Sequence, residues 1–255
     1  RRRAEGRVAG LISATRGNHG QSLALACAIH RVPATIVVPH GNSREKNAAM
    51  RAFGAMLIEH GEDFEAARSH AADLATERKL EMVPPFQRDL VVGVATYALE
   101  LFRAVPDLAT VYAPIGMGSG ICGLIIVRDL LRLATEIVGV VASQAPAYAL
   151  SFSTGAIVST PTAATFADGV ACRIPSAEAF AMIQRGAARV IQVEEHEIAA
   201  AMRAYYVDTH NLAEGAGAAA LAGLLKERAQ LDGRRVATIL SGGNIDREQY
   251  LKILA

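Results

Sequence analysis

The chain has 255 residues, of which 51% are hydrophobic and 20% charged, and its formal net charge is +1. This composition is typical of a soluble globular protein, and the balanced charge gives no case for a nucleic-acid or anionic-membrane surface. The sequence contains no run of about 18 apolar residues, so we expect no transmembrane span. The basic run Arg1–Arg3 is expected to be a solvated helix end, and the first residues are not typical of a signal peptide.

The length allows one large α/β domain or two small ones. The three cysteines lie far apart and form no CxxC pair, which argues against a zinc site. We expect buried, reduced thiols in a cytoplasmic protein at Cys27, Cys122 and Cys172.

Short apolar runs rich in β-branched residues alternate along the chain with segments of helical period. The runs predict strands at Gly10–Ala14, Ala34–Pro39, Met56–Glu59, Thr110–Pro114, Ile137–Ala142, Val190–Val193 and Val236–Leu240. The segments between them predict helices at His19–Arg31, Arg44–Phe53, Asp63–Lys79, Gly93–Ala104, Ser119–Leu131, Glu194–Thr209 and Glu214–Arg228. This alternation favours an α/β fold in which helices cover parallel sheets.

The pattern is weakest at Pro84-Pro85 and again at Pro106-Asp107. We therefore place a domain boundary after residue 104, so that residues 1–104 form a small α/β domain and residues 105–255 a larger one. The stretch Tyr148–Pro175 is rich in Ser, Thr, Ala and Pro, has no clean period, and is expected to be loop with short elements.

Three segments share one form, in which an apolar strand leads into a turn of glycine and polar residues. They are Ile12–Gln21, Ala113–Gly123 and Ile239–Asn244. In parallel sheets, ligands bind beyond the carboxyl ends of the strands, where these turns fall. Glycines let backbone N–H groups approach an anion, and a following helix adds its positive N-terminal end. The segment Ala113–Gly123 is therefore a candidate phosphate-binding loop.

The glycine spacing in that segment also allows two other interpretations. A dinucleotide site would require an acidic residue at the end of the next strand, for the ribose hydroxyl, but that strand ends Val140-Val141-Ala142-Ser143. In a purely structural interpretation, the glycines serve only to let the helix pack closely on the strand.

Several motifs follow one another in a fixed order. Gly17–Gln21 reads Gly-Asn-His-Gly-Gln, the glycine-rich loop lies in the middle of the chain, and Ser241–Asn244 reads Ser-Gly-Gly-Asn. Further landmarks are Thr35–Pro39, Lys46, Phe53–Ala55, Phe166–Val170 and Ala213–Gly217. Over nearly its whole length the chain resembles fold-type II pyridoxal-phosphate (PLP) enzymes, in particular the serine/threonine dehydratases and serine racemases.

The resemblance implies two open parallel-sheet α/β domains of the tryptophan synthase β-like architecture, and residues 105–255 would be the large PLP-binding domain. It also implies a role for each turn. The cofactor phosphate would be cradled by Gly116, Met117, Gly118, Ser119 and Gly120. The substrate carboxylate would be held at a helix N-terminus by Thr15, Arg16, Gly17 and His19.

Four further residues would act on the cofactor ring or beside it. Asn18 would donate to the ring oxygen. Ser241, followed by Gly242, would face the pyridine nitrogen with a neutral hydroxyl, which suits β-elimination. Glu214 would be the catalytic carboxylate near the ring or the leaving group. A helix-start carboxylate at Glu214 and a packed histidine at His19 are the structural alternatives.

The chain departs from the family's pattern at the cofactor lysine. The Schiff-base lysine of the family precedes the Gly-Asn-His-Gly-Gln turn, but only 16 residues precede Gly17 and none of them is lysine. We expect that the large domain's N-terminal part, with this lysine, lies upstream of Arg1. The lysines within the chain are each expected to be exposed on a helix, and they are Lys46, Lys79, Lys226 and Lys252.

Arg16 stands where serine racemases carry a serine that acts as acid and base, and an arginine cannot be that base at neutral pH. Some relatives bind a divalent metal after the strand that matches Ile137–Ala142. The corresponding stretch Val141–Tyr148 contains no acid, so we expect no metal site.

The sequence thus predicts a PLP-dependent ammonia-lyase (dehydratase) of amino-acid metabolism, which converts L-threonine or L-serine to a 2-oxo acid and ammonia. The resemblance implies a homodimer or homotetramer, and the expected reduced thiols indicate a cytoplasmic protein. Two alternatives stay open. Arg16 suggests 3-hydroxyaspartate as an acidic substrate, and a lysine-less relative would be a non-catalytic small-molecule-binding protein.

Overall fold

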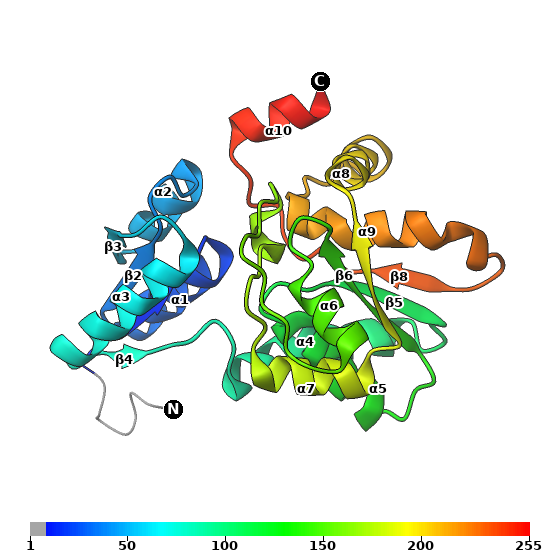
Figure 1. Cartoon of the computed structure of the whole chain (residues 1–255), viewed down its shortest axis with the longest axis horizontal. Helices are drawn as coiled ribbons and strands as arrows, with labels where there is room; N and C mark the ends of the chain where they lie inside the picture. Colours follow the sequence, from blue (N-terminus) through cyan, green and yellow to red (C-terminus); the bar gives the residue numbers. More distant parts are fainter. Residues whose placement is uncertain (1–8) are drawn as a thin grey trace. The chain divides into compact units, whose positions relative to one another are not determined.

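The computed structural model describes residues 9–255, so the basic run Arg1–Arg3 lies outside the described residues. The described residues form two compact units, each built on its own sheet (Figure 1). The first unit ends at Pro85 and also includes residues 244–252. The second unit consists of residues 86–243 and 253–255.

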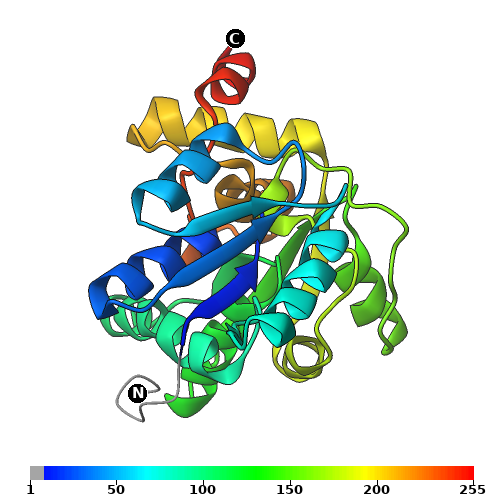
Figure 2. The same cartoon turned by 90° about the vertical axis from the view of Figure 1, so that its left-hand side faces the viewer.

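The first unit is a four-stranded parallel sheet with helices in its connections. In chain order it contains β1 (Leu11–Ala14), α1 (Asn18–His30), β2 (Ala34–Val38), α2 (Arg44–Ala52), β3 (Met56–Glu59), α3 (Phe64–Glu77) and β4 (Glu81–Met82). The strand order is β3-β2-β1-β4, and the strands lie side by side in blue and cyan in Figure 2. Most of α10 (Arg247–Leu254) also belongs to this unit.

The pleat of β2 explains why this sheet needs helices on both faces. Every residue of β2 is buried. Ile36 and Val38 pack with Cys27 of α1 and Met50 of α2, whereas Val37 packs in a separate cluster with α3. Successive side chains of a strand point to opposite faces, so a strand that is apolar throughout has to be covered twice.

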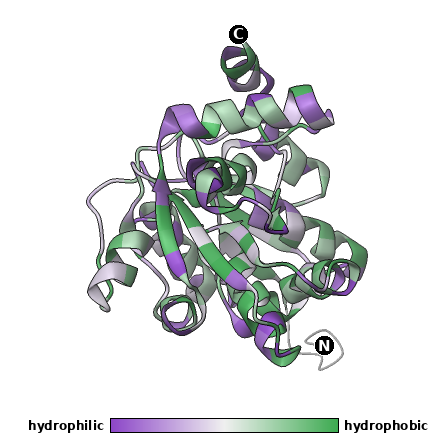
Figure 3. Cartoon of the chain, turned by 90° about the vertical axis from the view of Figure 1, so that its right-hand side faces the viewer, coloured by the Kyte–Doolittle hydropathy of each residue, from purple (hydrophilic) through white to green (hydrophobic). Residues whose placement is uncertain are grey.

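The second unit has a parallel sheet of order β7-β6-β5-β8. It begins with α4 (Arg88–Ala104), β5 (Thr110–Pro114), α5 (Ser119–Leu130), β6 (Glu136–Ala142) and α6 (Ala147–Thr154). It continues with the 3-10 helix η2 (Asp168–Val170), α7 (Ala177–Gly186), β7 (Arg189–Val193), α8 (Glu195–Thr209), α9 (Gly215–Glu227), the 3-10 helix η3 (Arg228–Gln230) and β8 (Val236–Thr238). Figure 3 shows green, hydrophobic residues along the strands of this sheet.

Helix α9 contacts all four strands of this sheet, and α8 packs against α9. The buried residues of α9 are all glycine or alanine, so the helix backbone can approach the strands closely. A separate hydrophobic cluster joins α4, α5 and α7 to the strands through residues that include Val111, Ile137 and Ile183.

The predicted strands and helices are largely confirmed, with shifts of one or two residues at most ends. The predicted helix at Gly93–Ala104 begins earlier, at Arg88. Three observed elements, β4, α7 and α10, were not predicted. The strand β4 has two residues and therefore carries no detectable period, and α10 follows a turn that ends the last predicted strand. The predicted loop at Tyr148–Pro175 contains α6 and η2 as short elements.

The division into units differs from the predicted boundary after residue 104. The first unit ends at Pro85, and α4 belongs to the second unit because it packs against α5. The proline pair Pro84-Pro85 therefore marks the division, and Pro106 lies in a connection within the second unit. Cys27, Cys122 and Cys172 are buried free thiols, as predicted. Within residues 9–255, no helix is long and apolar enough to cross a membrane.

Candidate functional site

The turn between β1 and α1 has the geometry of an anion-binding helix start. Thr15 is buried, and its Oγ1 accepts from the Gly17 amide at 2.9 Å. The first turn of α1 carries no acidic residue. Among residues 9–255, the amides of His19 and Gly20 have no hydrogen-bond acceptor. Free amides at the positive end of a helix dipole attract a carboxylate.

His19 is the second residue of α1, and its ring is turned into the first unit. Its Nε2 lies 3.0 Å from Ser13 Oγ, and this hydroxyl donates to the Val83 carbonyl at 2.6 Å. Since the hydroxyl hydrogen is used there, Nε2–H donates to Ser13 Oγ. Burial lowers the pKa of His19, so the ring is held neutral. The side chain is thus packed, and the backbone amide is the group of His19 that a substrate carboxylate would meet.

Arg16 precedes this helix start. Its Nε is buried and has no hydrogen-bond partner within residues 9–255, and the same holds for Nε2 of Gln21. No carboxylate of the described residues forms an ion pair with Arg16. A guanidinium in this state can still bind an anion in bidentate fashion.

The lysine at position 46 corrects an expectation from the sequence. Lys46 was expected on the surface of a helix, but it is 4% exposed in α2. A Cβ on Gly17 would lie 2.3 Å from Cδ of Lys46, so the lysine methylenes fill the space beside the turn. Lysine stems pack well on apolar surface, which explains why periodicity did not reveal the burial. The other three are exposed as expected, although Lys79 lies just after α3.

The second unit contributes the glycine-rich loop between β5 and α5. Gly118 precedes α5 with φ of 99°, a left-handed conformation that favours glycine. The loop carbonyls are engaged, because Tyr148 Oη donates to the Met117 oxygen at 3.0 Å and Tyr97 Oη to the Gly120 oxygen at 2.9 Å. Burial raises the pKa of both Tyr97 and Tyr148, so both phenols stay protonated and remain donors.

The amides of this loop complement the engaged carbonyls. Ser119, Gly120 and Ile121 lie in the first turn of α5, and their amides have no acceptor within residues 9–255. The first turn of α5 contains no acidic residue. A phosphate fits this arrangement of free amides, fixed carbonyls and small residues. The sequence did not single out Tyr97 and Tyr148, because their function depends on contacts with distant loops.

Close contacts join the later landmarks to this loop. A Cβ on Gly116 would lie 2.2 Å from the Gly169 carbonyl, and one on Gly169 would lie 2.7 Å from the Ala216 methyl. A Cβ on Gly217 would lie 2.1 Å from the Gly242 carbonyl. The landmarks around Gly116, Gly169, Gly217 and Gly242 therefore meet at one place in the second unit. Asp168-Gly169 is part of η2.

Glu214 precedes α9 and is 2% exposed. Its amide donates to the Gly242 carbonyl at 3.1 Å, and its side chain does not cap the helix. Glu214 thus stands at the start of α9, where the structural alternative of a helix-start carboxylate also puts it. Ser241 is exposed and follows the end of β8 at Thr238. Glu214 and Ser241 thus lie on neighbouring loops, which the Gly242 carbonyl connects.

The donor set fits the phosphate group of a cofactor. The fit rests on the free amides of Ser119–Ile121 and on the close approach of Gly116 to Gly169, which leaves no room for a larger residue. Within residues 9–255, no group of three or more His, Cys, Asp or Glu is placed to hold a metal ion.

Comparison with known proteins places the chain among cofactor-dependent enzymes. Residues 1–242 match the family described as pyridoxal-phosphate dependent enzymes. The chain is 38% identical over 239 residues to an L-threonine ammonia-lyase of Geobacter sulfurreducens, covering 93% of this chain and 59% of that enzyme. It is 30% identical to an L-threo-3-hydroxyaspartate ammonia-lyase of Saccharomyces cerevisiae, covering 98% of this chain and 77% of that enzyme.

Among solved structures, the processed form of threonine deaminase isoform 2 from Solanum lycopersicum is similar, with a TM-score of 0.91 and 31% identity. The similarity covers 98% of this chain and 74% of that one. The chain spans about half to three fifths of the length of the first curated relatives it matches.

Proposed function

We propose, because this chain belongs to the family of pyridoxal-phosphate dependent enzymes, that the protein is an ammonia-lyase acting on L-threonine or L-serine. The observation that carries the proposal is the loop at Gly116–Gly120, whose carbonyls are held by two protonated tyrosines and whose helix amides have no acceptor within residues 9–255. The threonine ammonia-lyase that is 38% identical supports the choice of reaction.

The proposed contacts with the cofactor come from three turns of the chain. Gly116, Met117, Gly118, Ser119 and Gly120 would bind the phosphate. Ser241 would donate to or accept from the ring nitrogen, with Gly242 beside it, and Asn18 would donate to the ring oxygen. When bound, PLP supplies the electron sink for loss of the α-proton and the β-hydroxyl of the substrate.

Side chains and backbone amides of the chain would bind the substrate carboxylate and exchange the proton. We propose that the substrate carboxylate binds at the start of α1, against the amides of His19 and Gly20 and the turn formed by Thr15, Arg16 and Gly17. The neutral ring of His19, fixed on Ser13, would hold this turn in place. Glu214, which is buried at the start of α9, would exchange a proton at the ring oxygen or at the leaving hydroxyl.

The test is an absorbance spectrum of the full-length protein with PLP, followed by an assay of ammonia release from L-threonine and L-serine. A visible cofactor band together with ammonia release supports the lyase. If the protein binds PLP but shows neither the visible cofactor band nor ammonia release, a non-catalytic small-molecule-binding relative is favoured.

A second substrate is favoured by one observation. Arg16 has a buried Nε without a partner and no ion pair among the described residues, so its guanidinium can receive a second carboxylate. We propose 3-hydroxyaspartate as this alternative substrate, which agrees with the similarity to the yeast enzyme.

Arg16→Ala separates the two substrates. If Arg16 recognises the second carboxylate, kcat/KM for 3-hydroxyaspartate should fall roughly 30-fold or more, which corresponds to about 2 kcal/mol. The kcat/KM values for threonine and serine should change little. Equal small changes on the three substrates would leave threonine and serine as the proposed substrates. Arg173→Ala, outside the turn, serves as the control variant.

We further propose that the protein works in the cytoplasm as a homodimer or homotetramer, without nucleic-acid or membrane partners. The support is the family resemblance, the buried free thiols and the balanced charge. Light scattering of the purified full-length protein measures the oligomeric state.

A further inference from the structure

We infer that Asn244 is a positioning residue for the cofactor, because its side-chain amide sets the orientation of the Asn18 amide. Asn244 Nδ2 donates to Asn18 Oδ1 at 3.0 Å. Both residues belong to the first unit. The inference rests on the proposed function, in which Asn18 donates to the ring oxygen of PLP.

The chemistry of an asparagine side chain explains why its orientation matters. One side of the amide is an acceptor oxygen, and the other is a nitrogen with two N–H donors. With Oδ1 turned towards Asn244, the nitrogen of Asn18 is directed elsewhere. An ionised ring oxygen needs a donor, and the reversed amide would present a second acceptor to it. A donor at position 244 therefore selects the useful orientation.

Hydrogen bonds on the next residues fix the place of Asn244. Asp246 Oδ1 accepts from Ser43 Oγ at 2.5 Å and from the Glu45 amide at 3.3 Å. In return, Glu45 Oε1 accepts from the Arg247 amide at 2.9 Å. Helices α2 and α10 thus cap one another's N-termini.

Asn244 stands two residues before Asp246, whose side chain the first unit holds. A side chain so close to an anchored residue offers its donor without first losing much conformational freedom.

Two substitutions of Asn244 separate orientation from packing. Asn244→Ala removes the donor and lets the Asn18 amide turn. Asn244→Asp keeps the shape but replaces the donor by a carboxylate, which attracts the nitrogen of Asn18 and reverses the amide. The matched control is Asn42→Asp, because Asn42 Nδ2 donates to Asn47 Oδ1 at 2.6 Å in a second Asn–Asn pair of the same unit.

The readouts on the full-length protein are PLP affinity by fluorescence titration, the visible band of the bound cofactor, and the melting temperature without PLP. Affinity should fall about 2- to 5-fold in Asn244→Ala and about tenfold or more in Asn244→Asp, which should also shift the band. Asn42→Asp should lower the melting temperature and leave affinity and band unchanged.

If Asn244→Asp loses less PLP affinity than Asn244→Ala, the inference is overturned and Asn244 has a packing role. Weaker binding by Asn244→Asp with an unshifted band indicates a charge effect and also overturns it. Either result leaves the proposed function intact. Failure of the unsubstituted protein to bind PLP would instead overturn the proposed function, and the inference with it.

Discussion

Three polar residues at or beside the β1–α1 turn have different environments, although each lies near a helix start in the sequence. His19 is tied to Ser13 and held neutral. Arg16 keeps a buried Nε without a partner among residues 9–255. Lys46 comes from α2 and packs its stem beside Gly17. Residue type and spacing predicted a binding turn here, but only three-dimensional contacts distinguish the packed side chains of His19 and Lys46 from the unpartnered Nε of Arg16.

Tyr97 is expected to tune cofactor affinity without touching the cofactor. Its phenol holds the Gly120 carbonyl at 2.9 Å, and burial keeps it protonated. Tyr97→Phe should release this carbonyl and weaken PLP binding about 3- to 10-fold, the usual worth of one hydrogen bond. Fluorescence titration measures the effect.

The control is Tyr205→Phe, since Tyr205 Oη bonds Thr238 Oγ1 at 2.9 Å in the same unit and not a carbonyl of the Gly116–Gly120 loop. It should change stability and leave PLP affinity unaltered. Equal affinities of Tyr97→Phe and the unsubstituted protein would show that the loop keeps its shape without the phenol.

Ser241 is expected to act on turnover. If its hydroxyl faces the ring nitrogen, Ser241→Ala removes the hydrogen bond between the hydroxyl and that buried nitrogen. Such a loss costs about 1–3 kcal/mol, which corresponds to a fall in kcat of roughly 5- to 150-fold. Steady-state kinetics measure this, and the melting temperature should stay unchanged because Ser241 is exposed. Unaltered kinetics would mean that another group faces the nitrogen.

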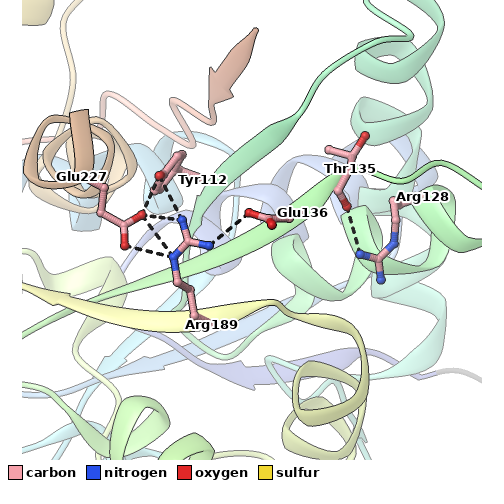
Figure 4. A network of polar contacts seen from close by, with 6 residues as sticks. All are labelled: Tyr112, Arg128, Thr135, Glu136, Arg189 and Glu227. Carbon is pink, nitrogen blue, oxygen red and sulfur yellow. Dashed lines mark hydrogen bonds and ion pairs between the residues drawn. The ribbon is translucent and has the colours of Figure 1, made fainter. Parts of the chain in front are cut away.

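A charged network joins several elements of the second sheet (Figure 4). Arg189 of β7 pairs with Glu227 of α9 at 2.6 Å and with Glu136 of β6 at 3.2 Å. Tyr112 of β5 donates to Glu227 Oε2 at 2.6 Å. One guanidinium thus connects two strands and a helix, and burial raises the pKa of Tyr112 to about 12, so its phenol remains a donor.

The network predicts a pH-dependent contribution to stability. Hydrogen bonding from Arg189 holds the pKa of Glu227 below its usual value. A carboxyl with a lowered pKa stabilises the fold above its unfolded pKa, near about 4.3, and loses this contribution as the pH falls through the lowered value. Glu227→Gln should cost about 1–2 kcal/mol at neutral pH, and the difference should shrink below about pH 4.

Urea unfolding at several pH values measures this difference. Glu136→Gln is the matched control, because the Glu136 side chain is 42% exposed and should contribute less than about 0.5 kcal/mol. A pH-independent difference for Glu227→Gln would contradict the ionic explanation.

At the scale of the whole molecule, the sequence predicted the parallel sheets, their helices and the loops that meet at Gly116, Gly169 and Gly242. These features depend on local patterns: apolar runs, helical periods and glycine turns. The boundary near Pro85 was missed because the assignment of α4 depends on its contact with α5, which lies beyond a strand. The return of residues 244–252 to the first unit depends on partners about 200 residues away.

This return has a consequence for synthesis on the ribosome. Asp246, which accepts from Ser43 at the start of α2, lies 203 residues downstream. At about 5–20 residues per second, some 10–40 seconds separate the emergence of the two partners. During that time α2 has only its local cap, in which Ser43 Oγ accepts from the Lys46 amide. The first unit is therefore completed late in synthesis, and the Asn18 amide meets the donor of Asn244 only after β8 has been made.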